Sequence, residues 1–151
     1  EQLEETIIIA KVYYVDEQAQ FLVSEYRIID GESKTDYIIS DFNELIKGPN
    51  KIDLYNFIPE GTEIIDTAYE DSYAFLNLSK EFVDNKEDNE LIDFLVINCI
   101  TATITSIPDI NGVVIKVEGE KIDKYGSLDI SRPIKNNYQL LSNTSCDAIS
   151  C

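Results

Sequence analysis

The stretch from Leu91 to Gly119 most constrains the fold, because it is the least polar part of the chain and its periodicity changes midway. Its first half is too long for an ordinary strand and alternates poorly, so we predict a packing helix from Leu91 to Ile107. The residues expected on its apolar face are Ile92, Val96, Cys99, Ile100 and Ile107, and those expected largely off it are Asp93, Asn98, Thr101 and Thr105. The run is only marginally long enough to cross a membrane and contains polar residues, which argues against a membrane span.

A turn and a strand follow this helix. Pro108 cannot continue a helix, and Asn111-Gly112 supplies residues that favour a turn. Val113 to Val117 then alternates in polarity, which predicts a half-buried strand that ends near Gly119.

Two hairpins are predicted before the long helix. Thr6 to Val15 is apolar on both faces, which is typical of a strand inside a sheet, and it pairs with Phe21 to Ile29. Glu63 to Tyr69 and Tyr73 to Leu78 form the second hairpin. Its expected inner face consists of Ala74, Leu76 and Leu78.

A shorter helix separates the hairpins. Ser33 and Asp36 have the spacing of a capping box, and apolar residues then recur at helical intervals up to Lys47. Gly48 suits the C-terminal cap and Pro49 stops the helix. The predicted fold class is therefore α+β in the order ββαββαβ, with a two-layer, mainly antiparallel sheet carrying both helices on one face. A further short strand is expected between Ser127 and Ile130.

Charge and composition exclude several classes of function. Twenty-nine acids against twelve bases give a net charge of −17, which repels nucleic acid and anionic lipid. Histidine is absent, so Ser-His and Cys-His nucleophiles and most catalytic zinc sites are excluded. Nucleotide-binding and hydrolase motifs are also missing. We therefore expect a protein that is not an enzyme and needs no cofactor.

Several local features leave alternatives open. The acidic run from Asp84 to Glu90 lacks the central glycine of a calcium loop, and its acids suit the N-terminus of the long helix. Cys99 is expected to be free, whereas Cys146 and Cys151 could form a small disulfide. No leader is visible, so Glu1 is expected to follow a removed segment or to mark an arbitrary start. We place one domain at residues 1–134 and a polar, mobile tail at 135–151.

Several motifs occur in one order along nearly the whole chain. They are Glu44-Leu45-Ile46-Lys47-Gly48-Pro49, Ile58-Pro59-Glu60-Gly61-Thr62, Ala74-Phe75-Leu76-Asn77-Leu78-Ser79, Thr103-Ile104-Thr105, the strand into Gly119, and Leu128 to Pro133. Together they resemble the GerMN domain family. The matched positions, expected to be structural, are Gly48, Pro49, Pro59, Gly61, Thr62, Asn77, Ser79, Thr103 and Gly119. The family often has aspartate at position 77 and glycine at position 72, where this chain has Asn77 and Ser72.

The resemblance implies an exported domain of the Gram-positive cell envelope, often on lipoproteins linked to sporulation and germination, with a plan similar to ring-building-motif folds. It implies a non-enzymatic interaction or assembly module that binds another envelope protein or itself. Any membrane contact would come through a lipid anchor before Glu1. The alternative is a module that binds cell-wall glycan or peptide, for which the nine tyrosines are suited. A hydrolase with paired carboxylates is the third hypothesis.

Overall fold

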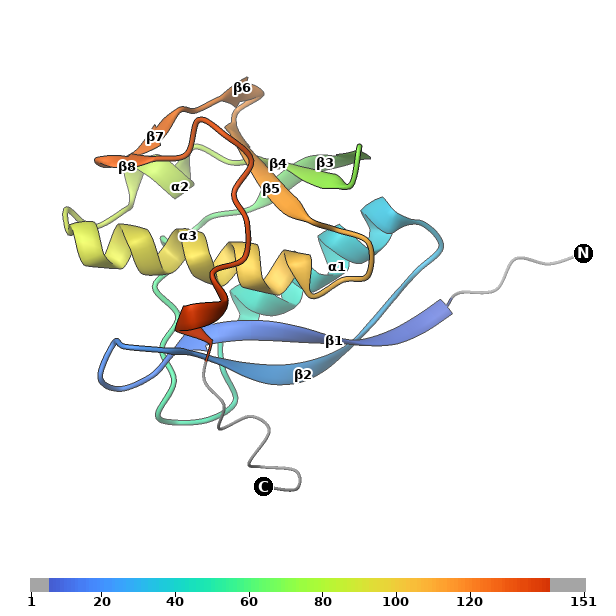
Figure 1. Ribbon diagram of the computed structural model, residues 1–151, viewed down its shortest axis with the longest axis horizontal. Coiled ribbons are helices and arrows are strands. Elements are labelled where there is room, and N and C mark those ends of the chain that lie inside the picture. Colours follow the sequence, from blue (N-terminus) through green and yellow to red (C-terminus); the bar gives the residue numbers. More distant parts are fainter. Residues whose placement is uncertain (1–5, 142–151) are drawn as a thin grey trace, which may run out of the picture.

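Two β-sheets enclose two helices in the computed structural model, which describes residues 6–141 (Figure 1). The first sheet is a hairpin of β1 (Thr6–Val15) and β2 (Leu22–Gly31). The second has the order β3-β4-β5-β6, with bounds Ile64–Glu70, Tyr73–Leu78, Gly112–Val117 and Glu120–Lys121. Helices α1 (Lys34–Lys47) and α3 (Glu90–Thr105) lie between the sheets.

Smaller elements complete the fold. They are α2 (Glu81–Asp84), the two-stranded sheet of β7 (Lys124–Tyr125) and β8 (Leu128–Asp129), and a 3-10 helix at Tyr138–Leu140. β4 and β5 pair in parallel because α3 forms the crossover between them, while β1–β2, β3–β4 and β5–β6 pair antiparallel. The predicted α+β class and the order ββαββαβ are confirmed.

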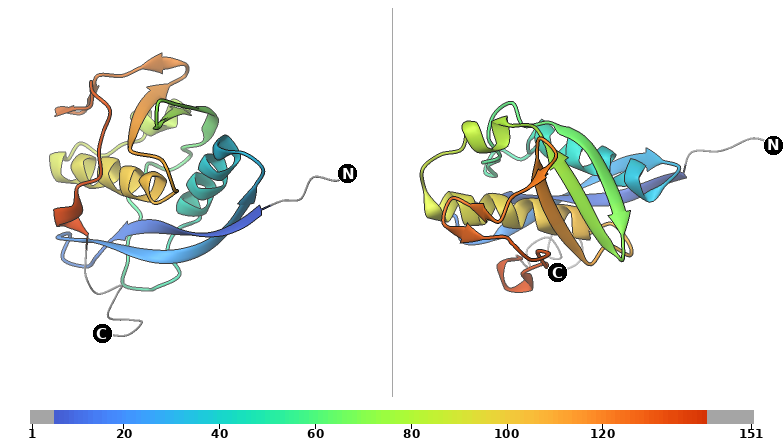
Figure 2. Two further views of the ribbon diagram at one scale, coloured as in Figure 1. Left: turned by 45° about the vertical axis from the view of Figure 1, so that its right-hand side comes forward. Right: turned by 90° about the horizontal axis from the view of Figure 1, so that it is seen from above.

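The arrangement of the layers differs from the prediction of one sheet with both helices on one face. The two sheets are separate, and the helices are packed on both sides (Figure 2). β1 is also not inside a sheet, because α3 takes the edge where another strand would pair. The backbone N–H of Tyr13 donates to Thr103 Oγ1 at 2.9 Å. Ser106 Oγ lies 3.3 Å from the carbonyl oxygen of Lys11, and its shorter hydrogen bond, at 2.6 Å, goes to the carbonyl oxygen of Thr103.

Helix α3 is buried on almost every side because it lies between two sheets. Asp93, Asn98 and Thr101, which the sequence placed largely off the apolar face, are all buried. Each is satisfied locally: Asp93 pairs with Lys86 at 3.0 Å, and Thr101 Oγ1 donates to the carbonyl of Ile97 at 2.9 Å. The side chain of Asn98 donates to the carbonyl of Phe94 at 2.8 Å.

The expected apolar face of α3 divides between two hydrophobic clusters. Val96 and Ile100 belong to the main core, which includes Phe42, Leu76 and Ile115. Cys99 belongs instead to a second cluster. The other members of that cluster are Tyr13, Val15, Leu22, Leu95 and Ala102. Cys99 is free and buried, as expected, and burial raises the pKa of its thiol.

Helix ends follow the predicted capping. Ser33 Oγ accepts a hydrogen bond from the N–H of Asp36 at 3.2 Å, while the Asp36 carboxylate accepts from Glu32 rather than from Ser33. Gly48, with φ 94°, ends α1. Asn89 caps α3 by accepting from the N–H of Ile92, with acids in the first turn as expected from the acidic run.

Two boundaries differ from the predictions. The left-handed residue after α3 is Asp109, with φ 73°, and Gly112 already belongs to β5. Residues at the start of the expected tail continue the domain, because Leu140 and Leu141 pack on the second cluster and Leu141 forms a parallel bridge to Leu22. Cys146 and Cys151 lie outside the described residues.

Candidate functional site

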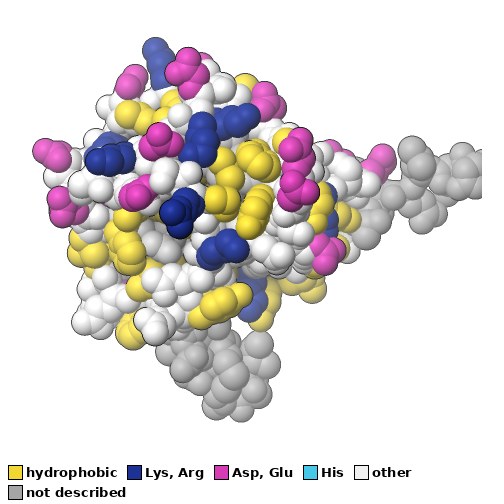
Figure 3. All heavy atoms as spheres, turned by 45° about the horizontal axis from the view of Figure 1, so that its top comes forward, with side chains coloured by type: hydrophobic (Ala, Val, Ile, Leu, Met, Phe, Trp, Pro, Cys, Tyr) yellow, Lys and Arg dark blue, Asp and Glu magenta, His cyan; other side chains and the backbone are white. Residues whose placement is uncertain are grey.

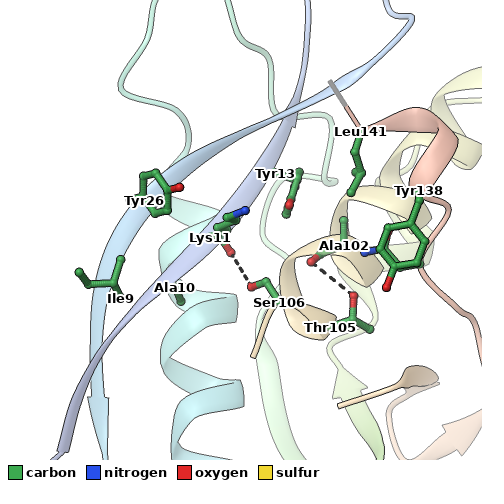
Figure 4. Close-up of a pocket in the computed structure, with 11 residues that line it drawn as sticks. Ile9, Ala10, Lys11, Tyr13, Tyr26, Ala102, Thr105, Ser106, Tyr138 and Leu141 are labelled. Atoms are coloured by element: carbon green, nitrogen blue, oxygen red, sulfur yellow. Dashed lines mark hydrogen bonds between the residues drawn. The ribbon is translucent and has the colours of Figure 1, made fainter. Parts of the chain in front are cut away.

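A cleft of about 330 Å³ opens between β1, the end of α3 and the C-terminal segment of the described chain (Figure 4). Tyr13, Tyr26 and Tyr138 contribute to its lining, and Lys11 and Ser106 come from the two elements that meet there. We call it the tyrosine cleft. The cleft lies here because the last turns of α3, rather than another strand, occupy the edge of β1.

Two side-chain contacts join the elements that border the cleft. The bonds from Tyr13 to Thr103 and from Ser106 to Lys11 attach the edge of β1 to the last turns of α3. Thr105 Oγ1 donates to the carbonyl oxygen of Thr101 at 2.7 Å, so this hydroxyl stays within its own helix. These hydroxyl groups therefore serve the packing of α3.

Tyr13 is suited to contact and hydrogen bonding rather than to proton transfer. Burial raises the pKa of Tyr13, and negative charge on Tyr26 or Tyr138 would raise it further. Lys11 Nζ lies 5.8 Å from the ring centroid of Tyr26, within the range of a cation–π contact. Among residues 6–141, those that line the cleft include neither aspartate nor glutamate. The paired carboxylates of a glycosidase are therefore not arranged in it.

An exposed apolar surface continues from the cleft along the outer face of the β1–β2 hairpin. It consists of Ile7, Ile9, Tyr26 and Ile28, with exposed fractions of 64%, 69%, 52% and 70%. Ile9 lies directly opposite Ile28 in the register, and Tyr26 lies opposite Lys11. We call these four residues the hairpin face. Ile9 and Tyr26 also line the tyrosine cleft, so the two features are continuous.

The outer edge of β2 is open next to this face. Val15 pairs outward with Tyr55, so alternate residues of β1 point their backbone groups away from β2, and the same alternation applies to β2. On β2 the outward positions are Leu22, Ser24, Tyr26, Ile28 and Asp30. Leu141 forms a parallel bridge with Leu22. Within residues 6–141, the other four residues form no backbone hydrogen bond along this edge. Such an edge can pair with an added strand.

The inner face of the same hairpin carries a buried ionic cluster. Arg27 contacts Glu25 at 2.7 Å and Glu44 at 3.2 Å, and it also donates to the carbonyl oxygen of Gly48. Burial alone would raise the pKa of Glu25, but hydrogen bonds from Arg27 and from two backbone N–H groups outweigh it, and this pKa is lowered. Both Glu25 and Arg27 are buried, so the cluster attaches the hairpin to α1 rather than offering a binding site.

The family-motif residues do not gather in one cleft. Thr62 donates to the carbonyl oxygen of Pro59 at 2.7 Å, and Ser79 Oγ accepts from the N–H of Glu63 at 2.9 Å, beside Gly61. This loop borders a smaller cleft of about 290 Å³. Elsewhere, Asn77 contacts Gly119, Thr103 contacts β1, and Gly48 and Pro49 follow α1. The Thr103 contact joins α3 to β1, and the others lie at turns or at strand ends.

Sequence reasoning missed the hairpin face. Thr6 to Val15 is apolar on both faces, but this pattern is also typical of a strand inside a sheet, which is the structure that the sequence predicts. A strand with one uncovered face has the same pattern when that face binds something. Within residues 6–141, no group of three or more His, Cys, Asp or Glu side chains is arranged to hold a metal ion.

Comparison with known proteins identifies the family. Residues 11–123 match the Germane family, described as sporulation and spore germination. The chain is 30% identical over 136 residues to the spore germination protein GerM of Bacillus subtilis (strain 168), covering 83% of this chain and 37% of that protein. The chain therefore spans little more than a third of that curated relative.

Solved structures share the fold. A protein of Clostridium perfringens described as a candidate lipoprotein is 29% identical, with a TM-score of 0.63 over 91% of this chain and 94% of that one. The first GerMN domain of GerM from Bacillus subtilis has a TM-score of 0.62 at 18% identity, over 85% of this chain and 97% of that one. The tandem GerMN domains of the same protein have a TM-score of 0.60 at 17% identity, over 91% of this chain and 47% of that one. The chain belongs to the Germane (GerMN) domain family of sporulation and spore germination.

Proposed function

We propose that this domain is a non-enzymatic assembly module that binds another envelope protein through the hairpin face and the open edge of β2. The observation that carries the proposal is the exposure of Ile7, Ile9 and Ile28 beside that edge. Exposed isoleucines on a sheet with unpaired backbone groups promote unwanted pairing unless a partner covers them. A partner strand added to β2 would bury these side chains and satisfy the backbone groups together.

The relatives support the cellular setting of this proposal. The similarity to GerM and to the clostridial candidate lipoprotein favours an extracytoplasmic domain of a Gram-positive cell envelope, anchored to the membrane by lipid and active in sporulation or germination. Among residues 6–141, no helix has the length and apolar character needed to cross a bilayer.

The test compares two surface changes. Immobilised wild-type domain and an Ile9→Ser/Ile28→Ser variant are incubated with solubilised envelope proteins, and retained proteins are identified by mass spectrometry. The control is Ile52→Ser, which changes an isoleucine that is 96% exposed on the loop after α1 and does not belong to the hairpin face. We expect the double variant alone to lose a specific protein that the wild type retains. Retention of the same proteins by all three would contradict the proposal.

Self-association is a second form of the same assembly. Sedimentation equilibrium at several concentrations measures it directly. If copies associate through the hairpin face, the wild type shows a mass that rises with concentration and the Ile9→Ser/Ile28→Ser variant stays monomeric. If the wild type remains monomeric, self-association is excluded, and the proposal then requires a different protein as the partner.

A second candidate function is the binding of cell-wall glycan or peptide in the tyrosine cleft. Aromatic faces next to the Lys11 ammonium favour it, because tyrosine rings stack on sugars or peptide groups and the cation attracts carboxylates. Co-sedimentation with purified cell wall tests it, using Tyr26→Ala/Tyr138→Ala against Tyr55→Ala as an exposed control. If both variants still bind the cell wall, the tyrosine cleft is not the binding site.

A further inference from the structure

Positive charge is concentrated in one part of this acidic chain. Residues 112–135 contain five cations and four acids, a net charge of +1, whereas residues 1–111 contain seven cations and 24 acids, a net charge of −17. The first of these segments supplies β5 to β8. Figure 3 shows that Lys and Arg side chains gather over the second sheet, beside hydrophobic side chains. This side of the molecule is opposite the β1–β2 hairpin (Figure 1).

Two lysines face each other directly on this sheet. Lys116 of β5 is the register partner of Lys121 of β6. Directly opposed side chains on adjacent antiparallel strands lie roughly 5 Å apart at Cβ, and like charges there are unfavourable. Lys121 is partly neutralised by Asp123 at 3.0 Å, but Lys116 has no ion-pair partner within residues 6–141. A bound anion would remove the repulsion between them.

Aromatic rings lie next to these ammonium groups. Tyr73 and Phe75 alternate along β4, on the face opposite to the buried Ala74 and Leu76. Lys116 Nζ is 6.0 Å from the ring centroid of Phe75, and Lys135 Nζ is 5.3 Å from that of Tyr73. We call the five residues Lys116, Lys121, Lys135, Tyr73 and Phe75 the cationic sheet face.

We propose that the cationic sheet face binds an extended acidic segment of a partner protein. Charge complementarity selects the occupant: in an extended strand whose acidic and apolar residues alternate, all the carboxylates lie on one side, where they can face the lysine ammonium groups. The attraction rests on ion pairs between exposed lysines and carboxylates, which salt screens, so binding weakens as the salt concentration rises. This surface is separate from the hairpin face, and the two proposals fail independently.

The test uses fluorescence anisotropy with a labelled extended peptide of alternating glutamate and valine, and a matched peptide with glutamine in place of glutamate. We expect Lys116→Gln/Lys121→Gln to bind the acidic peptide about tenfold more weakly than wild type. The control Lys47→Gln/Lys51→Gln removes the same charge elsewhere and should bind as wild type does. Circular dichroism of each variant verifies that the fold is kept.

Three results would overturn the proposal. They are no binding of the acidic peptide by wild type, equal binding of the glutamine peptide, and equal loss in both double variants. Inorganic polyphosphate is measured in parallel, and binding of polyphosphate without binding of the peptide would assign the face to a phosphate ligand instead. A peptide affinity that does not fall between low and physiological salt would also contradict an electrostatic site.

Discussion

The backbone N–H of Gly119 donates to Oδ1 of Asn77 at 2.7 Å, joining the end of β4 to the turn after β5. Gly119 has φ 86°, a conformation that glycine adopts without steric cost. The side chain of Asn77 also reaches Asp66 of β3, with its Nδ2 3.5 Å from Oδ2. The amide thus links β3 and β4 to the turn after β5, which gives a physical reason for an asparagine at this position.

Replacing Asn77 by aspartate should destabilise this chain. The new carboxylate could still accept from Gly119, but it would face Asp66, its register partner on β3. Directly opposed like charges cost about 0.5–1 kcal/mol at neutral pH. Urea unfolding measures the loss, and the double variant Asp66→Asn/Asn77→Asp should restore stability. A double variant as unstable as the single one would show that repulsion is not the cause.

Replacing Ser72 by glycine should stabilise the β3–β4 hairpin. Asp71 and Ser72 have φ values of 54° and 70°, typical of a two-residue turn that favours glycine. We expect a gain of roughly 0.5–1 kcal/mol in the free energy of unfolding, because serine is strained in this conformation. Thermal or urea unfolding measures the gain. Ser72→Ala keeps the strain and should give none, so equal gains in both variants would refute the argument.

Replacing Thr103 by valine should destabilise the junction between α3 and β1. Thr103 Oγ1 accepts from the N–H of Tyr13, and valine would leave that buried N–H without a partner. Such a loss costs about 1–3 kcal/mol. Thr101→Val is the matched control, since Thr101 is equally buried but donates only to the carbonyl of Ile97, which also accepts a helical bond. Equal unfolding midpoints for the two variants would contradict the assigned role.

Local patterns in the sequence predicted the elements well, because caps, turns and periodicity act over a few residues. Ser33, Gly48 and the alternation of Ala74, Leu76 and Leu78 each specify a structure within their own segment. The division into two sheets depends on a contact across 90 residues, from Tyr13 to Thr103, and no local pattern encodes it. The burial of Asp93 and Thr101 follows from that division.

The candidate site was harder to predict than the fold. The tyrosine cleft joins β1, α3 and a segment near Tyr138 that the sequence assigned to the tail. The cationic sheet face requires the register that places Lys116 opposite Lys121. Composition could supply the number of tyrosines and lysines, but only tertiary structure brings these side chains together. The resemblance to the GerMN family identified structural motifs, which is why it did not locate either surface.

Asp41 should make the domain less stable as pH rises. Its side chain is fully buried on α1, and neither carboxylate oxygen has a hydrogen-bond partner within residues 6–141. The pKa of Asp41 is raised to about 8, chiefly by burial and also by the nearby Glu44, while Arg27 acts to lower it. The folded state therefore holds a proton that the unfolded chain releases above about pH 4. Between about pH 4 and 8, the contribution of Asp41 to the free energy of unfolding therefore falls as pH rises, by up to about 1.4 kcal/mol per pH unit.

Asp41→Asn isolates this contribution, because an amide is neutral throughout the range. Urea unfolding at several pH values should show the variant and the wild type closest near pH 4, with the variant increasingly more stable toward pH 8. The exposed Asp53→Asn variant controls for the removal of one negative charge from a chain of net charge −17. If the difference between Asp41→Asn and wild type stays constant with pH, or matches that of Asp53→Asn, the buried carboxyl does not hold its proton. In that case a water molecule or another group must satisfy the two oxygens, because an ionised and unpartnered carboxylate in the core would be far too costly.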